Sequence, residues 1–229
     1  MVNIPIVTLD KIYIKPEEEN IYFLDCTRIE GSNDIISRKK ETLDSQIIRI
    51  SKQLKSKKII LADDVVFSGS VLRNIINRFN KLGIEVVGVI CSICTNESYK
   101  YFNDNLKYGI RSNYLLDDCV IDQICERDFY FGIAGSGIMV NKEEGLFKAP
   151  YFKPFGSPYE RASIPLQYER DFSIGCLDRS VYLWQEIEKL KQAKILMREL
   201  PEAIINTNED DEVVKKLIKE RDNLWKRYK

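Results

Sequence analysis

The sequence predicts an α/β domain in which a mostly parallel sheet is flanked by helices. Apolar runs of strand length alternate with amphipathic helical segments from Ile21 to Ile93. Two of these runs, Lys58–Asp64 and Glu85–Ile93, are apolar on both faces, which is typical of strands buried within a parallel sheet. The chain has 229 residues, of which 44% are hydrophobic, so it can bury a core of this size.

The first half of the chain supplies the sheet. We expect strands where aromatic and branched residues are dense, a loop where polar residues have no periodicity, and helices where apolar residues recur every three or four positions. The predicted elements are extended segments at Ile4–Leu9 and Lys11–Ile14, a strand at Ile21–Cys26, a mobile loop at Thr27–Lys40, a helix at about Asp44–Lys55, a turn at Val65–Ser70 and a helix from Val71 to Leu82 that is capped by Gly83.

The second half has weaker periodicity and a helical end. The predicted elements are helices at Ser98–Leu106 and Asp122–Arg127, a strand at Ser112–Leu116, two strands or a strand and a turn in Phe129–Val140, ordered irregular structure in Gly145–Phe172, a helical stripe from Leu183 to Leu200 stopped by Pro201, and a helix at about Glu209–Tyr228. These elements predict an α/β domain over 1–176, with an irregular aromatic region at about 145–176, and a helical C-terminal extension over 177–229.

Composition excludes several classes of function. Lysine plus arginine and aspartate plus glutamate both total 35, so binding of nucleic acid by bulk electrostatics is not expected. The chain has no histidine, which excludes Ser-His-Asp and Cys-His catalytic groups and histidine-ligated zinc. No basic-then-apolar leader is visible and the apolar runs are too short to span a bilayer. We therefore expect a cytoplasmic protein with no membrane partner and with its six cysteines as free thiols.

The segment Ile59–Leu72 (IILADDVVFSGSVL) has the pattern of a phosphate site. A buried strand leads into two carboxylates, Asp63 and Asp64, and then into a hydroxyl-rich turn with Gly69 and the start of a helix. The amides of such a turn and the positive end of the helix favour phosphate, and Gly69 would allow a ligand to approach the chain. Neighbouring carboxylates suit the hydroxyls of a vicinal diol, so the segment predicts a ribose 5-phosphate site. The alternative is an ordinary β–α loop in which the acids cap the helix.

This segment resembles the signature of the type I phosphoribosyltransferases, which is an apolar strand, two acidic residues, two apolar residues and a Thr-Gly-x-Thr-like turn. Asp63, Asp64, Val65 and Val66 fall on that pattern, and the resemblance covers about Ile21 to Ile93. It implies that the two acids hold the ribose hydroxyls and that the turn holds the 5-phosphate. The ribose- and phosphate-binding residues implied in this way are Asp63, Asp64, Val66, Phe67, Ser68, Gly69, Ser70 and Val71.

The turn departs from the family pattern in two places, and Phe67 occupies a position where family members carry an aspartate, a threonine or an aromatic residue. Ser68 replaces the usual threonine conservatively, whereas Val71 replaces a second threonine and removes one hydroxyl. A charge-assisted hydrogen bond contributes about 1.5–3 kcal/mol, so this change weakens binding without abolishing it. Phe67 cannot act as a catalytic base, so another group must take any proton that leaves the acceptor.

Family members also carry a pyrophosphate loop after the first sheet strand and a mobile basic loop that closes over the site. By position, Cys26–Gly31 with Thr27 and Arg28 matches the first loop, and Arg38–Lys40 matches the second. The resemblance implies that Thr27 and Arg28 bind pyrophosphate, that Arg28 and Lys39 stabilise it as it leaves, and that Mg²⁺ is held mostly by ligand oxygens and water. The alternatives are a plain surface turn and a solvated charge run.

The resemblance implies a phosphoribosyltransferase, an enzyme that transfers phosphoribosyl from phosphoribosyl pyrophosphate to a nitrogen acceptor such as a nucleobase, or catalyses the reverse reaction. Its ligands would be phosphoribosyl pyrophosphate or a nucleoside monophosphate. Two alternatives are a non-catalytic sensor of a ribose phosphate or nucleotide, and a transferase-like effector of a bacterial conflict system. The C-terminal helices are candidates for contact with a second copy or a partner protein.

Three other patterns have simple structural explanations. Cys91-x-x-Cys94, with Cys119 and Cys125 as imagined partners, is better explained as buried thiols than as a zinc site, because the two thiols end a strand and the second pair is widely spaced. Gly132–Gly137 favours a tight turn over a nucleotide loop. Five aromatic residues either stack on a base, as in the family's variable hood, or form a small core; they are Tyr151, Phe152, Phe155, Tyr159 and Tyr168.

Overall fold

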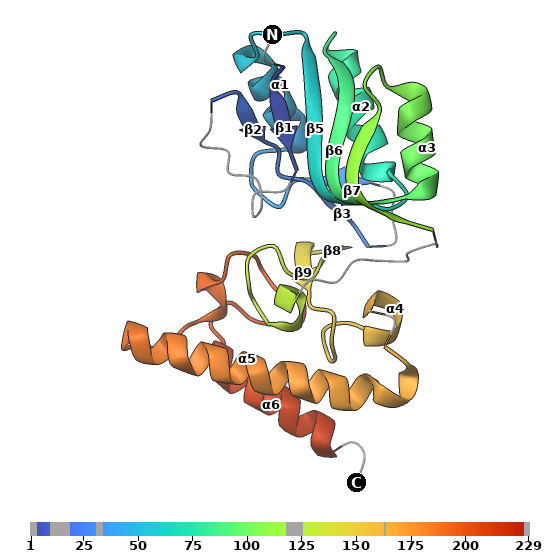
Figure 1. The fold of residues 1–229 in the computed structure, drawn as a ribbon. Coiled ribbons are helices and arrows are strands. Elements are labelled where there is room, and N and C mark those ends of the chain that lie inside the picture. Colours follow the sequence, from blue (N-terminus) through green and yellow to red (C-terminus); the bar gives the residue numbers. More distant parts are fainter. Residues whose placement is uncertain (1–3, 10–18, 31–33, 118–125, 163, 227–229) are drawn as a thin grey trace. The chain divides into compact units, whose positions relative to one another are not determined.

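The computed structural model describes residues 4–9, 19–30, 34–117, 126–162 and 164–226. The chain divides into two compact units, Met1–Gln123 and Ile124–Lys229 (Figure 1). The division expected at 176/177 instead falls inside one continuous helix, α5 (Glu169–Lys191), because residues on both sides of it share one hydrophobic core. Within the described ranges, no helix has the length and apolar character needed to cross a membrane.

The first unit is built on a five-stranded parallel sheet flanked by helices (Figure 1). Every neighbouring pair in it is parallel, which confirms the predicted class. In spatial order β2-β1-β5-β6-β7, the strands are β2 (Ile21–Phe23), β1 (Ile6–Thr8), β5 (Lys58–Val66), β6 (Glu85–Thr95) and β7 (Ile110–Leu116). A separate antiparallel pair joins β3 (Thr27–Arg28) to β4 (Ile35–Ile36).

Three helices connect the parallel strands. They are α1 (Leu43–Gln53), α2 (Ser70–Lys81) and α3 (Asn96–Asn105). The crossovers from β2 to β5, β5 to β6 and β6 to β7 all advance in one direction across the sheet, and because such crossovers are right-handed the three helices cover one face. Their apolar residues, such as Ile47, Ile75 and Phe102, join Leu61 and Val89 of the sheet in a single core.

The sheet begins earlier in the chain than expected. We expected Ile21–Cys26 to be its first strand, but β1 precedes it and lies between β2 and β5. Although β1 is short, Ile6 pairs with Ile21 on one side and with Ile60 on the other. The remaining first-half helices and parallel strands are confirmed within a few residues, as are the helix at 98–106 and the strand at 112–116. The expected segment Lys11–Ile14 lies outside the described residues.

The second unit combines a β-hairpin with two long helices. The hairpin pairs β8 (Ile138–Lys142) with β9 (Gly145–Ala149), and α5 packs against α6 (Val213–Lys226). A short helix, α4 (Pro158–Ala162), lies between hairpin and α5 in the chain. The core of this unit includes Phe131, Phe152, Phe155, Leu177, Val181, Trp184, Val213 and Leu217.

Several expectations for this half were wrong. Gly145–Phe172 is not irregular, since it contains β9, α4 and the first turn of α5. The stripe from Leu183 to Leu200 is not one helix, because α5 ends at Gln192 in the left-handed conformation (φ 55°), and Met197 and Leu200 reach the core from a short 3₁₀ turn. Among the candidate base-stacking aromatics, Tyr151, Phe152 and Phe155 are buried, whereas Tyr159 and Tyr168 are exposed.

Candidate functional site

The carboxyl ends of β2, β1 and β5 form one edge of the sheet at the same level. Thr8 pairs with Phe23 on one side and Ala62 on the other. The ladder continues one step further, where the Leu24 N–H donates to the Thr8 carbonyl (2.9 Å) and the Leu9 N–H to the Ala62 carbonyl (2.8 Å). Strand order also reverses here, because β1 leads to β2 on one side and β2 leads back to β5 on the other. Open α/β sheets bind ligands at such a reversal.

Asp63 and Asp64 lie within β5 at this edge, and the strand does not end with them as expected. β5 continues to Val66, which pairs with Cys94 of β6. Successive side chains of a strand point to opposite faces, so Asp63 shares a face with its register partner Cys91 while Asp64 lies on the other. The expectation that both carboxylates converge on one diol therefore does not fit this backbone, and one acid at most faces a given hydroxyl pair.

Local hydrogen bonds orient both carboxylates. Asp63 Oδ1 accepts from the Asp64 N–H (3.0 Å), and Asp64 Oδ1 accepts from the Val65 N–H (2.8 Å). Neither acid caps α2, whose N-cap residue is Gly69 and whose first N–H, that of Ser70, donates to the Ser68 hydroxyl. The alternative in which the acids serve as helix caps is therefore wrong.

The turn between β5 and α2 leaves the N-terminus of that helix open. Thr42 and Thr95 accept N-capping hydrogen bonds in α1 and α3, whereas the N-cap residue of α2 is Gly69, which has no side chain to do so. The Ser68 hydroxyl accepts one long hydrogen bond from the Ser70 N–H (3.4 Å). Ser68 and Ser70 are exposed, and their hydroxyls contact each other at 3.2 Å. No acceptor within the described ranges takes a hydrogen bond from the backbone N–H of Ser68 or Gly69. The partial positive charge of the helix end is thus available to an anion.

Gly69 is required by packing within the unit. It has a φ of +68°, and a Cβ placed there would lie 2.8 Å from a ring carbon of Phe102 in α3. The ring therefore occupies the space that we expected a ligand to use. The carbonyl of Phe67 also accepts from the hydroxyls of Thr95 (2.8 Å) and Ser98, so α3 fixes the turn from below. Val66 is buried in the core and Val71 packs against it.

Thr27 and Arg28 lie further from β5 than expected. They form β3 and follow β2, the edge strand, and β1 separates β2 from β5. The segment directly after the first sheet strand is instead Leu9 followed by residues 10–18, which lie outside the described ranges. The premise that placed the pyrophosphate loop at Cys26–Gly31 is therefore incorrect, although Arg28 is exposed.

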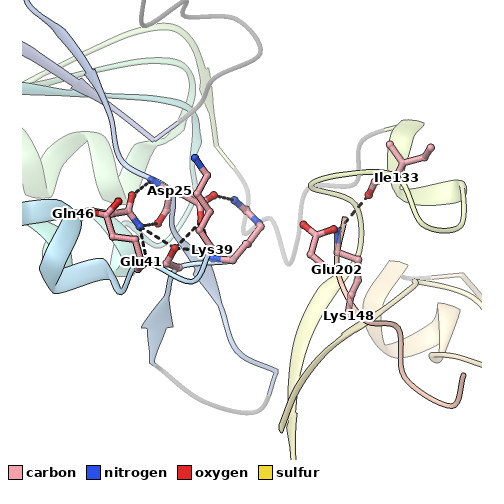
Figure 2. Close-up of polar contacts among 9 residues, drawn as sticks. Asp25, Lys39, Glu41, Gln46, Ile133, Lys148 and Glu202 are labelled. Carbon is pink, nitrogen blue, oxygen red and sulfur yellow. Dashed lines mark hydrogen bonds and ion pairs between the residues drawn. The ribbon is translucent and has the colours of Figure 1, made fainter. Parts of the chain in front are cut away.

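A buried carboxylate at the end of β2 organises the basic loop (Figure 2). Asp25 is 3% exposed, and its Oδ2 accepts from the Ser37 hydroxyl (2.9 Å) and the Arg38 N–H (2.7 Å) while its Oδ1 accepts from Arg38 Nη1 (3.0 Å). Gln46 of α1 closes the network, because its Oε1 accepts from the Asp25 N–H (2.9 Å) and its Nε2 donates to Ser37 Oγ (2.8 Å). The described part of the expected mobile loop is therefore pinned at Arg38.

The charges in this network shift the pKa of Asp25. Burial raises the pKa of the carboxyl, but the guanidinium of Arg38, the Ser37 hydroxyl and the Arg38 N–H together outweigh burial and lower the pKa below its usual value. Lys39 lies beside this network with its Nζ 5.3 Å from the centre of the Phe23 ring. Arg38 and Lys39 thus provide two cations at the β2 end of the edge.

The Cys26 thiol connects this network to β5. Burial, then the negative charge of Asp63, and then that of Asp25 raise the pKa of Cys26 to about 12, against the opposing effect of Arg38. Asp63 and Arg38 therefore act on one buried atom. Burial also raises the pKa of Cys91, that of Cys94 to about 12 and that of Cys176 to about 11. These four cysteines are free and buried, while Cys119 and Cys125 lie outside the described residues.

The second unit contains a buried ion pair beside its glycine segment. Lys148 is 2% exposed, and its Nζ donates to Glu202 Oε2 at 2.7 Å and to the Ile133 carbonyl at 3.3 Å (Figure 2). The segment Gly132–Gly137 precedes β8 as a turn rather than joining two strands, and the Gly137 N–H donates to Asp128 (2.9 Å). Because these groups hold one another, they explain the local fold without a ligand.

The described residues of the first unit could bind Mg²⁺ only together with a ligand whose oxygens, with water, supply most of the coordination. The described residues contain no cluster of three or more His, Cys, Asp or Glu side chains that could hold a metal ion. Asp63 and Asp64 supply two carboxylates at the sheet edge, and Mg²⁺ commonly binds one or two carboxylates together with ligand phosphates and water. A phosphate ligand would have to provide most of the coordination.

Sequence reasoning missed Asp25, Ser37 and Gln46. Asp25 ends the apolar run IYFLDC, and Gln46 lies on the face of α1 that also carries Leu43, Ile47 and Ile50. A polar residue on an apolar helix face is a signal for a buried hydrogen-bond partner.

Comparisons with known proteins do not assign the chain to a family, so its class is inferred from the fold and the site. No family model, no curated protein and no solved structure matches the chain. The fold defines an α/β protein whose sheet edge carries carboxylates, an open helix N-terminus and a pinned arginine.

Proposed function

We propose that the first unit binds a ribose 5-phosphate ligand at the carboxyl edge of its sheet and acts as a phosphoribosyltransferase-like enzyme. The substrate would be phosphoribosyl pyrophosphate, and the acceptor would be a nitrogen nucleophile such as a nucleobase. The observation that carries the proposal is the N-terminus of α2, where the N-cap residue Gly69 offers no side chain and where the helix follows β5 and its two acids directly at the reversal of strand order.

The residues of this edge would divide the work of binding. The free N–H groups of Ser68 and Gly69 and the hydroxyls of Ser68 and Ser70 would hold the 5-phosphate. One of Asp63 and Asp64 would accept from the ribose hydroxyls, since the two lie on opposite faces of β5. Cations at the β2 end would stabilise the negative charge of departing pyrophosphate. Mg²⁺ would be held by ligand oxygens with help from one carboxylate.

The test combines binding with turnover. Calorimetry with ribose 5-phosphate, phosphoribosyl pyrophosphate and Mg²⁺ should give saturable binding, and Ser68→Ala and Ser70→Ala together should weaken it by roughly ten- to a hundredfold for two lost hydrogen bonds of about 1 kcal/mol each or somewhat more. A matched pair near the amino end of β5, away from the site, is Ser51→Ala and Ser56→Ala, which should leave binding unchanged. If the protein shows no saturable binding of any of these ligands, the proposal is wrong.

Comparing Asp63→Asn with Asp64→Asn locates the sugar. One variant should lose about tenfold or more in affinity for ribose 5-phosphate while the other keeps it, because only one carboxylate can face the diol. An affinity equal to that of the wild type in both variants would show that neither acid contacts the ribose.

A second candidate is a non-catalytic sensor of the same ligands. Val71 favours it, because it removes a hydroxyl that the related turn offers to the phosphate, and no sequence signature for an acceptor is present. Release of pyrophosphate with a panel of nucleobases separates the two. Tight binding without any release supports the sensor.

A further inference from the structure

The backbone and the side chain of Arg38 are both held by hydrogen bonds to one carboxylate. We call the residues that hold it, Asp25, Ser37 and Gln46, the Arg38 mount. The backbone N–H and the Nη1 of Arg38 both donate to Asp25, at 2.7 and 3.0 Å. The preceding Ser37 donates to the same carboxylate and accepts from Gln46, so α1 braces the turn that carries Arg38. Most surface arginines sample many rotamers, whereas this one is fixed in one orientation before any ligand arrives.

Asp25 itself has little capacity left for a ligand. It is 3% exposed, and both of its oxygens already accept hydrogen bonds from Ser37 and Arg38. Arg38 differs, because its side chain is 28% exposed and a guanidinium has five N–H donors. Of these, Asp25 takes a bond from Nη1, and no other described residue accepts from the side chain. The free part of the fork suits a phosphate group, which it can bind through two parallel hydrogen bonds.

The mount lies on the same edge of the sheet as β5 but beyond β1. Asp25 follows Leu24, whose N–H bonds to Thr8, and the next N–H bond in the ladder joins Leu9 to Ala62 just before Asp63. Neighbouring strands are about 4.8 Å apart, so β2 and β5 are separated by roughly 10 Å at this level. The charge of Asp63 raises the pKa of the buried Cys26 thiol and that of Arg38 lowers it, so both charges lie within electrostatic range of one group.

We propose that Asp25, with Ser37 and Gln46, is a positioning residue that holds Arg38 ready for a second phosphate group of the ligand, separate from the phosphate at the α2 turn. The inference rests on the proposed function and replaces Arg28 by Arg38 as the guanidinium that faces pyrophosphate. Phosphoribosyl pyrophosphate carries such a second group on the anomeric carbon, whereas ribose 5-phosphate does not. The expected signature is therefore selectivity between these two ligands.

Calorimetry with each ligand and Mg²⁺ measures this selectivity. Arg38→Gln should weaken binding of phosphoribosyl pyrophosphate by about ten- to a hundredfold and change the affinity for ribose 5-phosphate less than threefold. Asp25→Asn should reproduce that pattern, and adding it to Arg38→Gln should weaken binding no further, because both act through one group. Arg38→Lys should restore part of the lost affinity.

The matched controls come from an exposed pair of the same chemistry nearby. Arg49 donates two hydrogen bonds to Glu41 at 2.9 and 3.1 Å, so Arg49→Gln and Glu41→Gln remove the same charges without touching the mount. Both controls should leave the two affinities unchanged. If Asp25→Asn does not fold, Ser37→Ala is measured in its place, with the same selective loss expected.

Three results overturn the inference. If Asp25→Asn weakens the binding of both ligands equally, Asp25 has only a structural role. If Arg38→Gln binds phosphoribosyl pyrophosphate as the wild type does, Arg38 does not contact the ligand. If the losses add in the double variant, the two residues act independently. Inorganic pyrophosphate serves as an independent probe. If the wild-type protein binds pyrophosphate through Arg38 but does not bind ribose 5-phosphate, the proposed function fails while the anion mount stands.

Discussion

Gly69 and Gly83 flank the same helix, α2, with nearly the same backbone conformation, φ +68° and +70°. They differ in the space around them. A Cβ on Gly69 would lie 2.8 and 3.0 Å from two ring carbons of Phe102 and 3.2 Å from Ser98 Oγ, whereas a Cβ on Gly83 meets nothing within 4 Å. The two alanine variants therefore share backbone strain and separate the steric contribution.

The magnitudes follow from these two terms. An alanine in the left-handed region costs about 1–2 kcal/mol, which is the whole effect expected for Gly83→Ala. Gly69→Ala should cost about 2–5 kcal/mol, because an added methyl in a packed site contributes about 1–3 kcal/mol more. Phe102→Leu replaces the obstructing ring with a smaller side chain, so the Gly69→Ala/Phe102→Leu double variant should recover part of that excess.

The assay must follow the first unit alone. Urea-dependent hydrogen exchange of peptides from 58–83 gives the free energy of opening around α2. Fluorescence reports the second unit, because both tryptophans, Trp184 and Trp225, lie in it, and it should show no shift in either variant. If the two variants lose the same stability, or if Phe102→Leu recovers none of the difference, the contact between Gly69 and Phe102 does not determine the residue type.

Three other outcomes are expected. Asp25→Asn should lower the free energy of unfolding by about 2–3 kcal/mol at pH 7. Because the folded-state pKa of Asp25 is lowered, this stabilisation is present above about pH 4 and disappears as the pH falls through the folded pKa. The exchange data of wild type and variant should therefore converge below about pH 4, and a difference that stays constant with pH would contradict the ion-pair explanation. Lys148→Met should cost about 3–5 kcal/mol in the fluorescence transition, because it strands Glu202 in a largely buried pair, and Glu202→Gln should cost less on that background than alone; equal costs would mean that the two do not interact. Cys26 and Cys176, with pKa values raised to about 12 and 11, should react with an aromatic disulfide at pH 8 only after unfolding, as mapped by mass spectrometry, and rapid labelling of the native protein would contradict their burial.

The sheet and helices around β5 were predictable because their signals are local. The apolar run Lys58–Val66 and the stripe through Ile75 and Phe79 each stand out within a dozen residues. The first half of helix α5 was missed because polar residues occupy buried positions in it. Ser173 and Ser180 are fully buried, and their hydroxyls donate to the carbonyls of Glu169 and Cys176 one turn earlier. Such satisfied hydroxyls hide the apolar stripe from sequence analysis.

The site was predictable to a similar extent. Acids, hydroxyls and glycine in the order Asp63 to Ser70 identified the edge of the sheet that carries them. Sequence could not show that β5 continues beyond both acids to Val66, because strand length depends on its pairing with β6. It also could not pair Asp25 with Gln46, since 21 positions separate them in the chain.

The absence of histidine and the burial of the thiols together give this protein an almost constant charge near neutrality. The pKa values of the four described cysteines are shifted further above this range. A phosphate monoester, by contrast, changes from monoanion to dianion near pH 6. Between about pH 5.5 and 7 the ligand phosphate therefore titrates while the four described thiols stay neutral. Any change in affinity with pH across this interval reports the protonation of the ligand, so calorimetry in buffers of different ionisation enthalpy would count the protons that a phosphate ligand releases on binding.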